Sequence, residues 1–103
     1  MAQSTDGGSV AYLRIVRPQI SVELYDAITA NIEVTTNHPL GLIMHAAGEA
    51  DGMWHIVEVW DSEEYAQRFD REVLVPAIEA AYGSPPPGDS PSLGFELHQL
   101  VTP

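Results

Sequence analysis

Residues 41–64 read GLIMHAAGEADGMWHIVEVWDSEE, and this stretch decides the fold. Two strand-like runs, 41–47 and 53–60, flank the glycine-bounded segment GEADG, which is typical of a β-hairpin loop. A helix is then expected to begin, because Asp61 and Glu64 have the spacing of a capping box and acidic side chains favour a helix N-terminus. The stretch therefore predicts a hairpin followed at once by a helix.

The segments on either side complete a pattern of six elements. Upstream, the alternating run 10–16 predicts a strand, and Ser21 is a typical N-cap for a helix that reaches about Ile32. Downstream, the second helix is expected to end at Gly83, and 93–101 predicts the last strand. The order β-α-β-β-α-β is that of the ferredoxin-like fold, an α+β fold with a four-stranded antiparallel sheet and both helices on one face.

The domain organisation is simple. A chain of 103 residues suffices for one domain, which we assign to 10–103. Residues 1–9 are polar and contain glycine, so we expect a disordered lead that lacks the features of a signal peptide. Pro76 removes a backbone donor from the second helix and predicts a kink or a restart there. A proline-rich loop is expected at 84–92.

The charge balance excludes several classes of partner. Fifteen acidic residues face four arginines and no lysine, which gives a formal net charge of −11. A negative surface repels phosphate backbones and anionic lipids, so we expect neither nucleic acid nor a membrane as a partner. Because the chain has no cysteine and no lysine, it cannot carry a thiol nucleophile, a thiolate metal site or a Schiff base. With no apolar run long enough to span a bilayer, the default location is the cytoplasm.

Alternation along the strands divides their side chains between the two faces of the sheet. We expect the more uniformly apolar set, such as Val57 and Val59, to lie beneath the helices. The second strand is ambiguous, and His45 faces away from the helices only if Leu42 and Met44 pack beneath them. The set then predicted for the open face consists of Tyr12, Arg14, His45, Trp54, Glu58, Trp60, Glu96 and His98.

Aromatic walls with a few ionisable groups are typical of a small-molecule pocket. Histidine is the natural proton shuttle near neutral pH, so we predict His45, Glu58 and His98 as catalytic residues. The other five members of the set, Tyr12, Arg14, Trp54, Trp60 and Glu96, are predicted to bind the substrate. A purely structural interpretation stays open, in which these groups are solvated or form ion pairs across a dimer interface. Two histidines and a carboxylate also suit non-haem iron, but the strands show no tight ligand spacing, so we predict no metal site.

The open face also predicts an assembly. Its large apolar residues, among them Trp54 and Trp60, are covered by no other element of the predicted monomer. An uncovered apolar sheet is an association surface. We therefore expect a homodimer with sheet packed on sheet, and a pocket enclosed between the sheet and the partner surface.

Residues 41–48 and 54–64, together with Phe69 and Pro76, resemble the dimeric α+β barrel superfamily. The nearest branch resembles the antibiotic-biosynthesis monooxygenase-like proteins and uncharacterised actinobacterial relatives. The resemblance covers about residues 10–101. It implies a dimeric α+β barrel, and it matches Trp60 to the tryptophan that lines the substrate cavity of the monooxygenase branch.

The superfamily includes cofactor-free monooxygenases, isomerases, cyclases and haem-degrading enzymes. The haem-degrading branch binds iron through a histidine on the second helix, and residues 62–82 contain no histidine. The resemblance therefore implies a small monooxygenase-like enzyme without a cofactor, acting on an aromatic or polyketide-like molecule. Two alternatives stay open: a proton-transfer isomerase or cyclase in the same cavity, and a binding or accessory protein without turnover.

Overall fold

The structure is a computed structural model that describes residues 11–83 and 91–103. The predicted lead at 1–9 and most of the predicted loop at 84–92 lie outside these ranges. The elements follow the predicted order, with the second helix divided into three parts. They are β1 (Tyr12–Val16), α1 (Val22–Thr35), β2 (Leu42–Ala50), β3 (Met53–Trp60), α2 (Glu63–Phe69), the π-helical turn η2 (Asp70–Leu74), α3 (Val75–Tyr82) and β4 (Ser92–Glu96).

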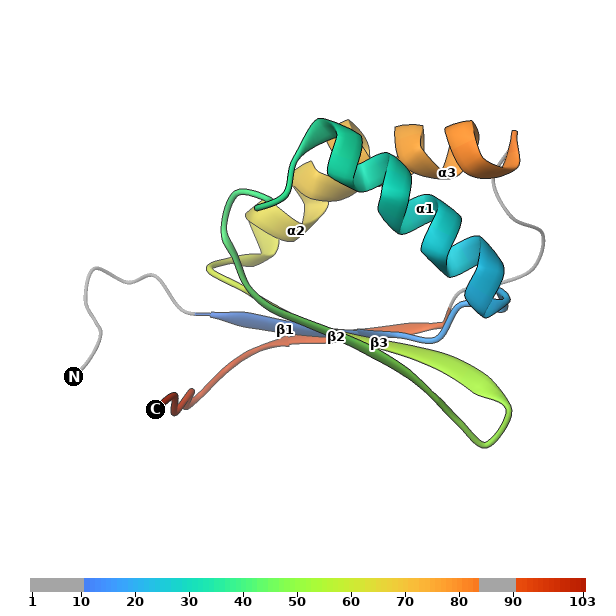
Figure 1. Cartoon of the computed structure of the whole chain (residues 1–103). Helices are drawn as coiled ribbons and strands as arrows, with labels where there is room; N and C mark the ends of the chain where they lie inside the picture. The colour runs from blue at the N-terminus through green and yellow to red at the C-terminus, as the bar shows by residue number, and fades with distance from the viewer. Residues whose placement is uncertain (1–10, 84–90) are drawn as a thin grey trace.

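The four strands form one antiparallel sheet in the order β2-β3-β1-β4. Figure 1 shows all the helices on one side of this sheet. The predicted ferredoxin-like α+β fold is thereby confirmed. None of the helices in the described ranges is long and apolar enough to cross a membrane.

The hairpin between β2 and β3 is tighter than predicted. The strands continue to the pair Ala50 and Met53, so the loop consists of Asp51 and Gly52 alone. Their φ angles are 55° and 76°. A two-residue hairpin turn needs positive φ at both positions, which Asp-Gly accepts at little cost. The predicted strand 41–47 was therefore too short, because the strand continues through Gly48.

The helix starts were predicted with mixed success. Ser21 is the N-cap of α1, and its Oγ accepts a hydrogen bond from the backbone N–H of Leu24 at 3.1 Å. The capping box expected from Asp61 and Glu64 was wrong. Ser62 is the N-cap of α2, and its side chain makes no capping hydrogen bond within the described residues. The acidic first turn still complements the positive end of the helix.

The prediction for Pro76 is confirmed by an interruption of the helix. The backbone N–H of Val75 bonds to the carbonyl of Asp70, five residues earlier, and α3 then starts with Pro76 in its first turn. Proline cannot donate a backbone hydrogen bond and its ring collides with the carbonyl four residues before it, so a local change of helix type relieves the conflict. The helix ends at Gly83, which has a φ of 90°.

The faces of the sheet are the reverse of the prediction. Trp60 is fully buried against α2, with its ring centroid 5.2 Å from that of Phe69. Arg14, Glu58 and His45 are directly opposite one another on neighbouring strands, and Arg14 bonds to Asp70 of η2. This set therefore faces the helices, and its predicted place on the open face was wrong.

The uniformly apolar set lies on the other face, which no helix of the described ranges covers (Figure 1). The strand pairing puts Leu13, Val59, Met44 and Phe95 side by side there. Val59 at the centre is 3% exposed, whereas Met44 and Phe95 on the edge strands are 42% and 45% exposed. Apolar uniformity was thus the wrong guide to the helix-covered face, because that face contains polar groups around a cavity.

A bulge explains why β2 could not be assigned by alternation. The pairing register with β3 shifts between Leu42 and Met44, so one extra residue is inserted. Beyond such a bulge, each side chain of the strand lies on the opposite face of the sheet from the one that simple alternation predicts. Leu42 and His45 consequently share the helix-covered face, although they are three residues apart, and Met44 lies on the open face.

The last strand is shorter than predicted. β4 ends at Glu96, and the segment beyond it, which contains His98, has no strand structure. The backbone N–H of Leu97 still bonds to the carbonyl of Ala11 at 2.8 Å. His98 is exposed, so its prediction as a mid-strand residue was wrong.

Candidate functional site

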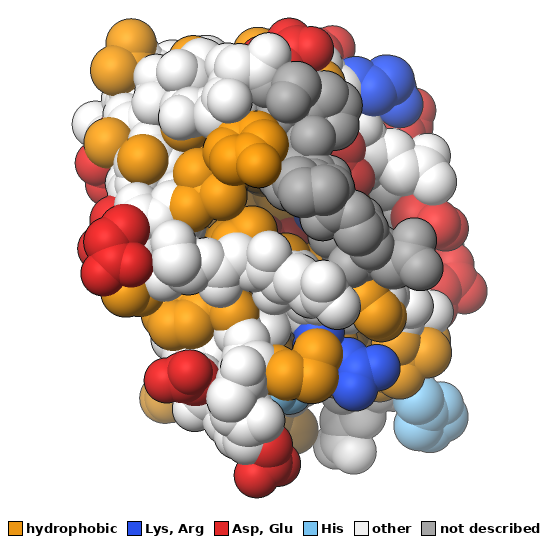
Figure 2. Space-filling view, turned by 90° about the vertical axis from the view of Figure 1, so that its right-hand side faces the viewer, with side chains coloured by type: hydrophobic (Ala, Val, Ile, Leu, Met, Phe, Trp, Pro, Cys, Tyr) orange, Lys and Arg blue, Asp and Glu red, His pale blue; other side chains and the backbone are white. Residues whose placement is uncertain are grey.

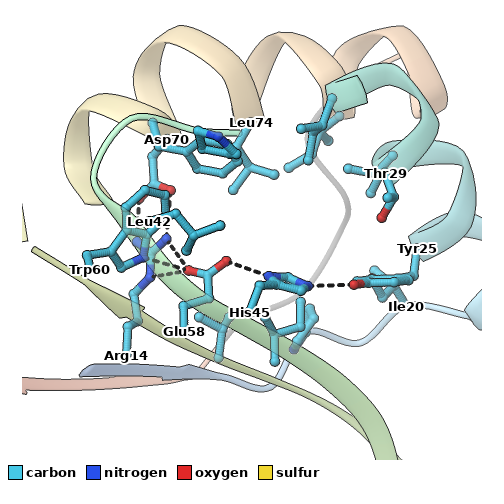
Figure 3. A pocket seen from close by; sticks show the side chains of 18 of the residues that line it. Arg14, Ile20, Tyr25, Thr29, Leu42, His45, Glu58, Trp60, Asp70 and Leu74 are labelled. Carbon is cyan, nitrogen blue, oxygen red and sulfur yellow. Dashed lines mark hydrogen bonds and ion pairs between the residues drawn. The ribbon is translucent and has the colours of Figure 1, made fainter. Parts of the chain in front are cut away.

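A pocket of about 490 Å³ lies between the helix-covered face of the sheet and the helices (Figure 3). It is formed within a single chain, whereas the sequence predicted that the site residues would line a pocket between the sheet and a partner surface. Most of its wall is apolar, and its polar groups come both from the strands, as with Arg14 and Glu58, and from the helices, as with Tyr25 and Asp70. The apolar lining includes Val16, Ile20, Ile28, Ile32, Leu42, Ile56, Phe69, Leu74 and Ile78.

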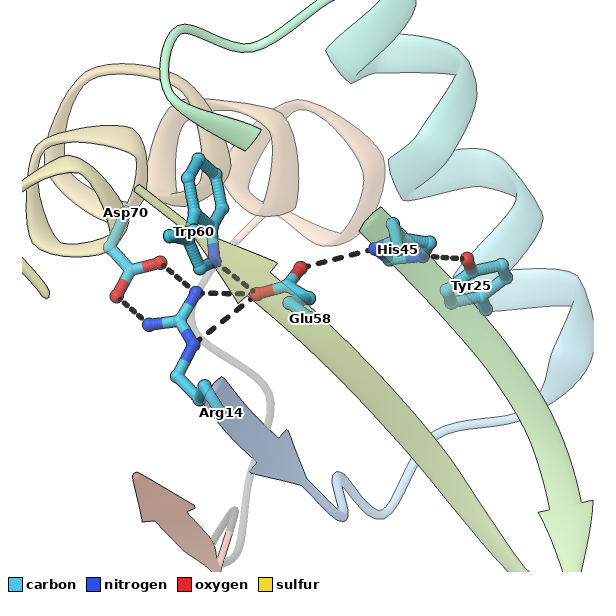
Figure 4. Close-up of polar contacts among 6 residues, drawn as sticks. All are labelled: Arg14, Tyr25, His45, Glu58, Trp60 and Asp70. Carbon is cyan, nitrogen blue, oxygen red and sulfur yellow. Dashed lines mark hydrogen bonds and ion pairs between the residues drawn. The ribbon is translucent and has the colours of Figure 1, made fainter. Parts of the chain in front are cut away.

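Arg14 of β1 is the centre of the polar group (Figure 4). Its Nη2 donates to Oε1 of Glu58 at 2.9 Å, and its Nε donates to the same oxygen at 3.3 Å. Toward the helices, Nη1 and Nη2 donate to the two carboxylate oxygens of Asp70 at 2.6 and 3.0 Å. Burial alone would lower the pKa of Arg14, but the two carboxylates raise it. The guanidinium is thus a permanent cation whose donors serve two protein carboxylates.

Glu58 is the buried carboxylate of the site, with 6% of the residue exposed. Its Oε1 also accepts a hydrogen bond from Nε1 of Trp60 at 3.1 Å. Burial by itself raises the pKa of Glu58, but the hydrogen bonds from His45, Arg14 and Trp60 and the charge of Arg14 outweigh burial and lower it. Glu58 is therefore ionised at neutral pH and can only accept hydrogen bonds.

His45 of β2 joins this carboxylate to the first helix (Figure 4). Its Nδ1 lies 3.1 Å from Oε2 of Glu58, and its Nε2 lies 2.6 Å from the hydroxyl of Tyr25 on α1. Because the carboxylate can only accept, a neutral His45 carries its proton on Nδ1 and accepts the hydroxyl proton of Tyr25 on Nε2. The result is a chain of hydrogen bonds from Tyr25 through His45 to Glu58, with Arg14 at its far end.

Half of the predicted site residues meet at this pocket. Arg14, His45, Glu58 and Trp60 line it. The other four lie outside its lining. Tyr12 packs against the buried cluster around Trp60. Trp54 packs against Tyr25, with ring centroids 5.0 Å apart. Glu96 is opposite Tyr12 at the end of the edge strand β4, and His98 lies in the segment that follows β4.

Two members of the polar group, Tyr25 and Asp70, were not predicted from the sequence. Tyr25 belongs to the apolar stripe of α1, where it looks like a core residue, and Asp70 looks like one more solvated acid. A half-buried tyrosine usually finds a hydrogen-bond partner for its hydroxyl, and this rule was the available signal for Tyr25. Asp70 had no such signal, because its place depends on the register of the π-helical turn.

Within residues 11–83 and 91–103, no three histidine, aspartate or glutamate side chains gather closely enough to hold a metal ion.

On the surface, Figure 2 shows hydrophobic side chains across the middle of one end of the molecule and acidic side chains toward its margins. Glu33 adds a further carboxylate to the pocket lining beside Glu58 and Asp70.

No protein-family model and no curated protein matches the sequence. Solved structures match by fold. A candidate antibiotic biosynthesis monooxygenase from Caulobacter crescentus aligns with a TM-score of 0.65 at 10% identity, over 88% of this chain and 92% of that chain. The Streptomyces coelicolor monooxygenase from the gene ActVA-Orf6, solved with nanaomycin D, aligns with a TM-score of 0.63 at 12% identity, over 92% and 93%.

A haem-degrading protein from Mycobacterium tuberculosis, solved with two haems in its active site, aligns with a TM-score of 0.54 at 21% identity. The alignment covers 88% of this chain and 99% of that chain. Sequence identities this low support a shared fold but do not indicate a shared reaction. The chain has the α+β fold of the antibiotic biosynthesis monooxygenase-like proteins, as the resemblance in its sequence predicts.

Proposed function

We propose that this protein is a small cofactor-independent enzyme, monooxygenase-like, that acts on an aromatic or polyketide-like molecule by first removing a proton from it. The observation that carries the proposal is the hydrogen bond between His45 and Glu58 at the wall of a largely apolar pocket of about 490 Å³. An imidazole that is oriented by a buried carboxylate is a competent proton acceptor near neutral pH.

The charges of the pocket favour a neutral substrate. Three carboxylates line it, from Glu33, Glu58 and Asp70, against the single guanidinium of Arg14. That guanidinium already donates to two of the carboxylates. Among the lining residues that the structure describes, a substrate carboxylate or phosphate would find no free arginine and would meet like charges, which repel it. A molecule with phenol or ketone groups on an apolar frame fits this lining better.

The chemistry needs no reductant. Loss of a proton from a CH₂ group between aromatic rings leaves an electron-rich carbanion that can react with O₂. In the complete reaction the CH₂ group becomes a carbonyl, one oxygen atom stays in the product, and the other leaves with the two hydrogens as water. The substrate supplies all the electrons. A structure with a similar fold, the monooxygenase solved with nanaomycin D, supports only the broader proposal of an aromatic or polyketide-like substrate.

The same hydrogen bonds also suit a second function. Proton removal at one carbon and its return at another is a complete isomerase or cyclase reaction, and the chain from Tyr25 to Glu58 is sufficient for it. A binding protein without turnover would use the pocket alone. These functions differ in whether O₂ is consumed and whether protons exchange.

We further propose that the protein is a homodimer in which the open apolar faces of two sheets pack together. Leu93 and Phe95 are exposed on that face beside Leu13 and Val59. Contiguous exposed apolar surface of this kind usually marks an interface. Because each pocket lies within its own chain, the dimer is expected to stabilise the sheet without enclosing the substrate.

The decisive experiment uses 1,8-dihydroxyanthrone as the probe. The proposal predicts that the protein consumes one O₂ per probe molecule, and that without O₂ it exchanges the CH₂ protons of the probe with deuterated water. His45→Ala is expected to lose both activities. His55→Ala is the matched control, because His55 lies on the other face of β3 and bonds to the carbonyl of Met53.

Each outcome selects one function. Proton exchange without O₂ consumption would favour the isomerase or cyclase. Binding of the probe without either activity would leave a binding protein and would overturn the enzymatic proposal. Equal loss of activity in His55→Ala and His45→Ala would contradict the proposal that His45 is the base and that the reaction takes place in this pocket.

A further inference from the structure

Both ring nitrogens of His45 are engaged in hydrogen bonds within the protein, although 36% of its side chain is exposed. Its Nδ1 is occupied by Glu58 and its Nε2 by the hydroxyl of Tyr25 at 2.6 Å. The imidazole therefore has no free ring nitrogen for a substrate. Tyr25 lines the pocket, and Figure 3 shows its hydroxyl directed at His45 along the pocket wall. Any proton that reaches the imidazole in this arrangement has to pass through the oxygen of Tyr25.

From this geometry we propose that Tyr25 is the catalytic residue that contacts the substrate, and that it transfers the substrate proton to His45. The inference rests on the proposed function and deepens it. His45 is then the proton acceptor behind Tyr25, and Glu58 is the residue that positions and stabilises His45. Arg14 and Asp70 hold Glu58 in turn.

The proton transfer balances without another reactant. The acidic C–H or O–H group of the substrate gives its proton to the oxygen of Tyr25, while the hydroxyl proton of Tyr25 passes to Nε2 of His45. Tyr25 is neutral before and after the step. The charges that form are a substrate anion and an imidazolium, and the imidazolium is paired with the carboxylate of Glu58 at 3.1 Å. The arrangement is the same as in a catalytic triad, where a hydroxyl gives its proton to an imidazole that a carboxylate orients.

The surroundings of Tyr25 suit this role. Burial raises the pKa of Tyr25, and the nearby charges of Glu58 and Asp26 raise it further. The hydroxyl thus stays protonated near neutral pH and can donate to His45. The ring is fixed on its other side by Trp54, with ring centroids 5.0 Å apart. A fixed ring keeps the hydroxyl oriented and lowers the entropic cost of the transfer.

The test compares Tyr25→Phe with Tyr82→Phe. Tyr25→Phe removes one oxygen atom and keeps the ring against Trp54, whereas Tyr82 is exposed on α3 and serves as the matched control. With 1,8-dihydroxyanthrone, Tyr25→Phe is expected to lower kcat roughly 100- to 10,000-fold, the usual size of a general acid-base contribution. KM should change little, and Tyr82→Phe should match the wild type.

A second measurement needs no turnover. Nitrogen NMR of the His45 imidazole at neutral pH is expected to show Nδ1 protonated and Nε2 accepting a hydrogen bond, and Tyr25→Phe should move the Nε2 resonance toward that of a free acceptor. An unchanged Nε2 resonance would overturn the hydrogen bond on which the inference rests. A kcat for Tyr25→Phe within twofold of the wild type would overturn the catalytic role of Tyr25 and leave the proposed function intact. If the wild type neither exchanges protons nor consumes O₂, the proposed function itself fails.

Discussion

Arg14 and Asp70, 56 positions apart in the chain, form two parallel hydrogen bonds that join the sheet to the helices (Figure 4). Asp70 is the first residue of the π-helical turn, so the change of helix type places its carboxylate over β1. A bidentate pair between a guanidinium and a carboxylate fixes the orientation of the two groups as well as their distance. The same guanidinium holds Glu58, and through Glu58 it orients His45.

Removal of Arg14 should destabilise the fold strongly. In Arg14→Ala, Glu58 stays buried and ionised without its cation, and breaking such a buried pair costs about 3–5 kcal/mol. Arg68→Ala is the control, because the Arg68–Glu72 pair is exposed on the helix surface and such pairs contribute less than about 1 kcal/mol. Urea unfolding followed by circular dichroism measures both losses. Similar losses in the two variants would contradict the structural role of Arg14.

Glu58 should make stability depend on acid pH. Its pKa is lower in the folded protein than in the unfolded chain, where the ordinary value is about 4.3. The folded state therefore binds its proton less readily, and the stabilisation that is present above this value is lost as pH falls through the folded pKa. Urea unfolding from pH 7 down to pH 3 should show this loss.

Glu58→Gln is the comparison for the pH series. The variant is expected to be less stable at neutral pH, because Arg14 and His45 lose their carboxylate, and its stability should fall less steeply between pH 5 and pH 3. A slope equal to that of the wild type would show that other carboxylates cause the acid sensitivity.

A charge on the open face of the sheet should dissociate the proposed dimer. Phe95 is 45% exposed there, and Phe95→Glu would place one carboxylate from each chain in the interface. Val34→Glu is the matched control, because Val34 is 86% exposed on α1, away from that face. Light scattering at micromolar concentration should give a dimer for the wild type and for Val34→Glu, and a monomer for Phe95→Glu. A monodisperse monomer of the wild type would end the dimer proposal.

We expect no stable haem complex, although a haem-degrading protein shares the fold. Residues 62–82 contain no histidine, and both ring nitrogens of His45 are already hydrogen-bonded. After haem titration and gel filtration, the protein fractions should show no Soret band. A parallel run of free haem alone serves as the control for the baseline absorbance in those fractions. A Soret band that elutes with the protein would contradict the prediction.

The sequence by itself determined the order of the elements and several of their ends. Ser21 and Gly83 mark helix ends through their own side-chain and backbone chemistry, and Pro76 disturbs its helix because it lacks a donor. Alternation also put Arg14, Glu58 and Trp60 together on one face. These features are local, so neighbouring residues suffice to predict them.

Only the tertiary structure decided which face the helices cover and which side chains meet there. Both faces of the sheet carry large apolar residues, so composition cannot tell a face packed against helices from one left for another partner. The bulge in β2 brings His45 to the helix-covered face, and its position depends on pairing with β3. Tyr25 and Asp70 reach the same pocket from α1 and from the π-helical turn. Contacts between segments so far apart depend on how the helical layer docks, and no local pattern in the sequence encodes that.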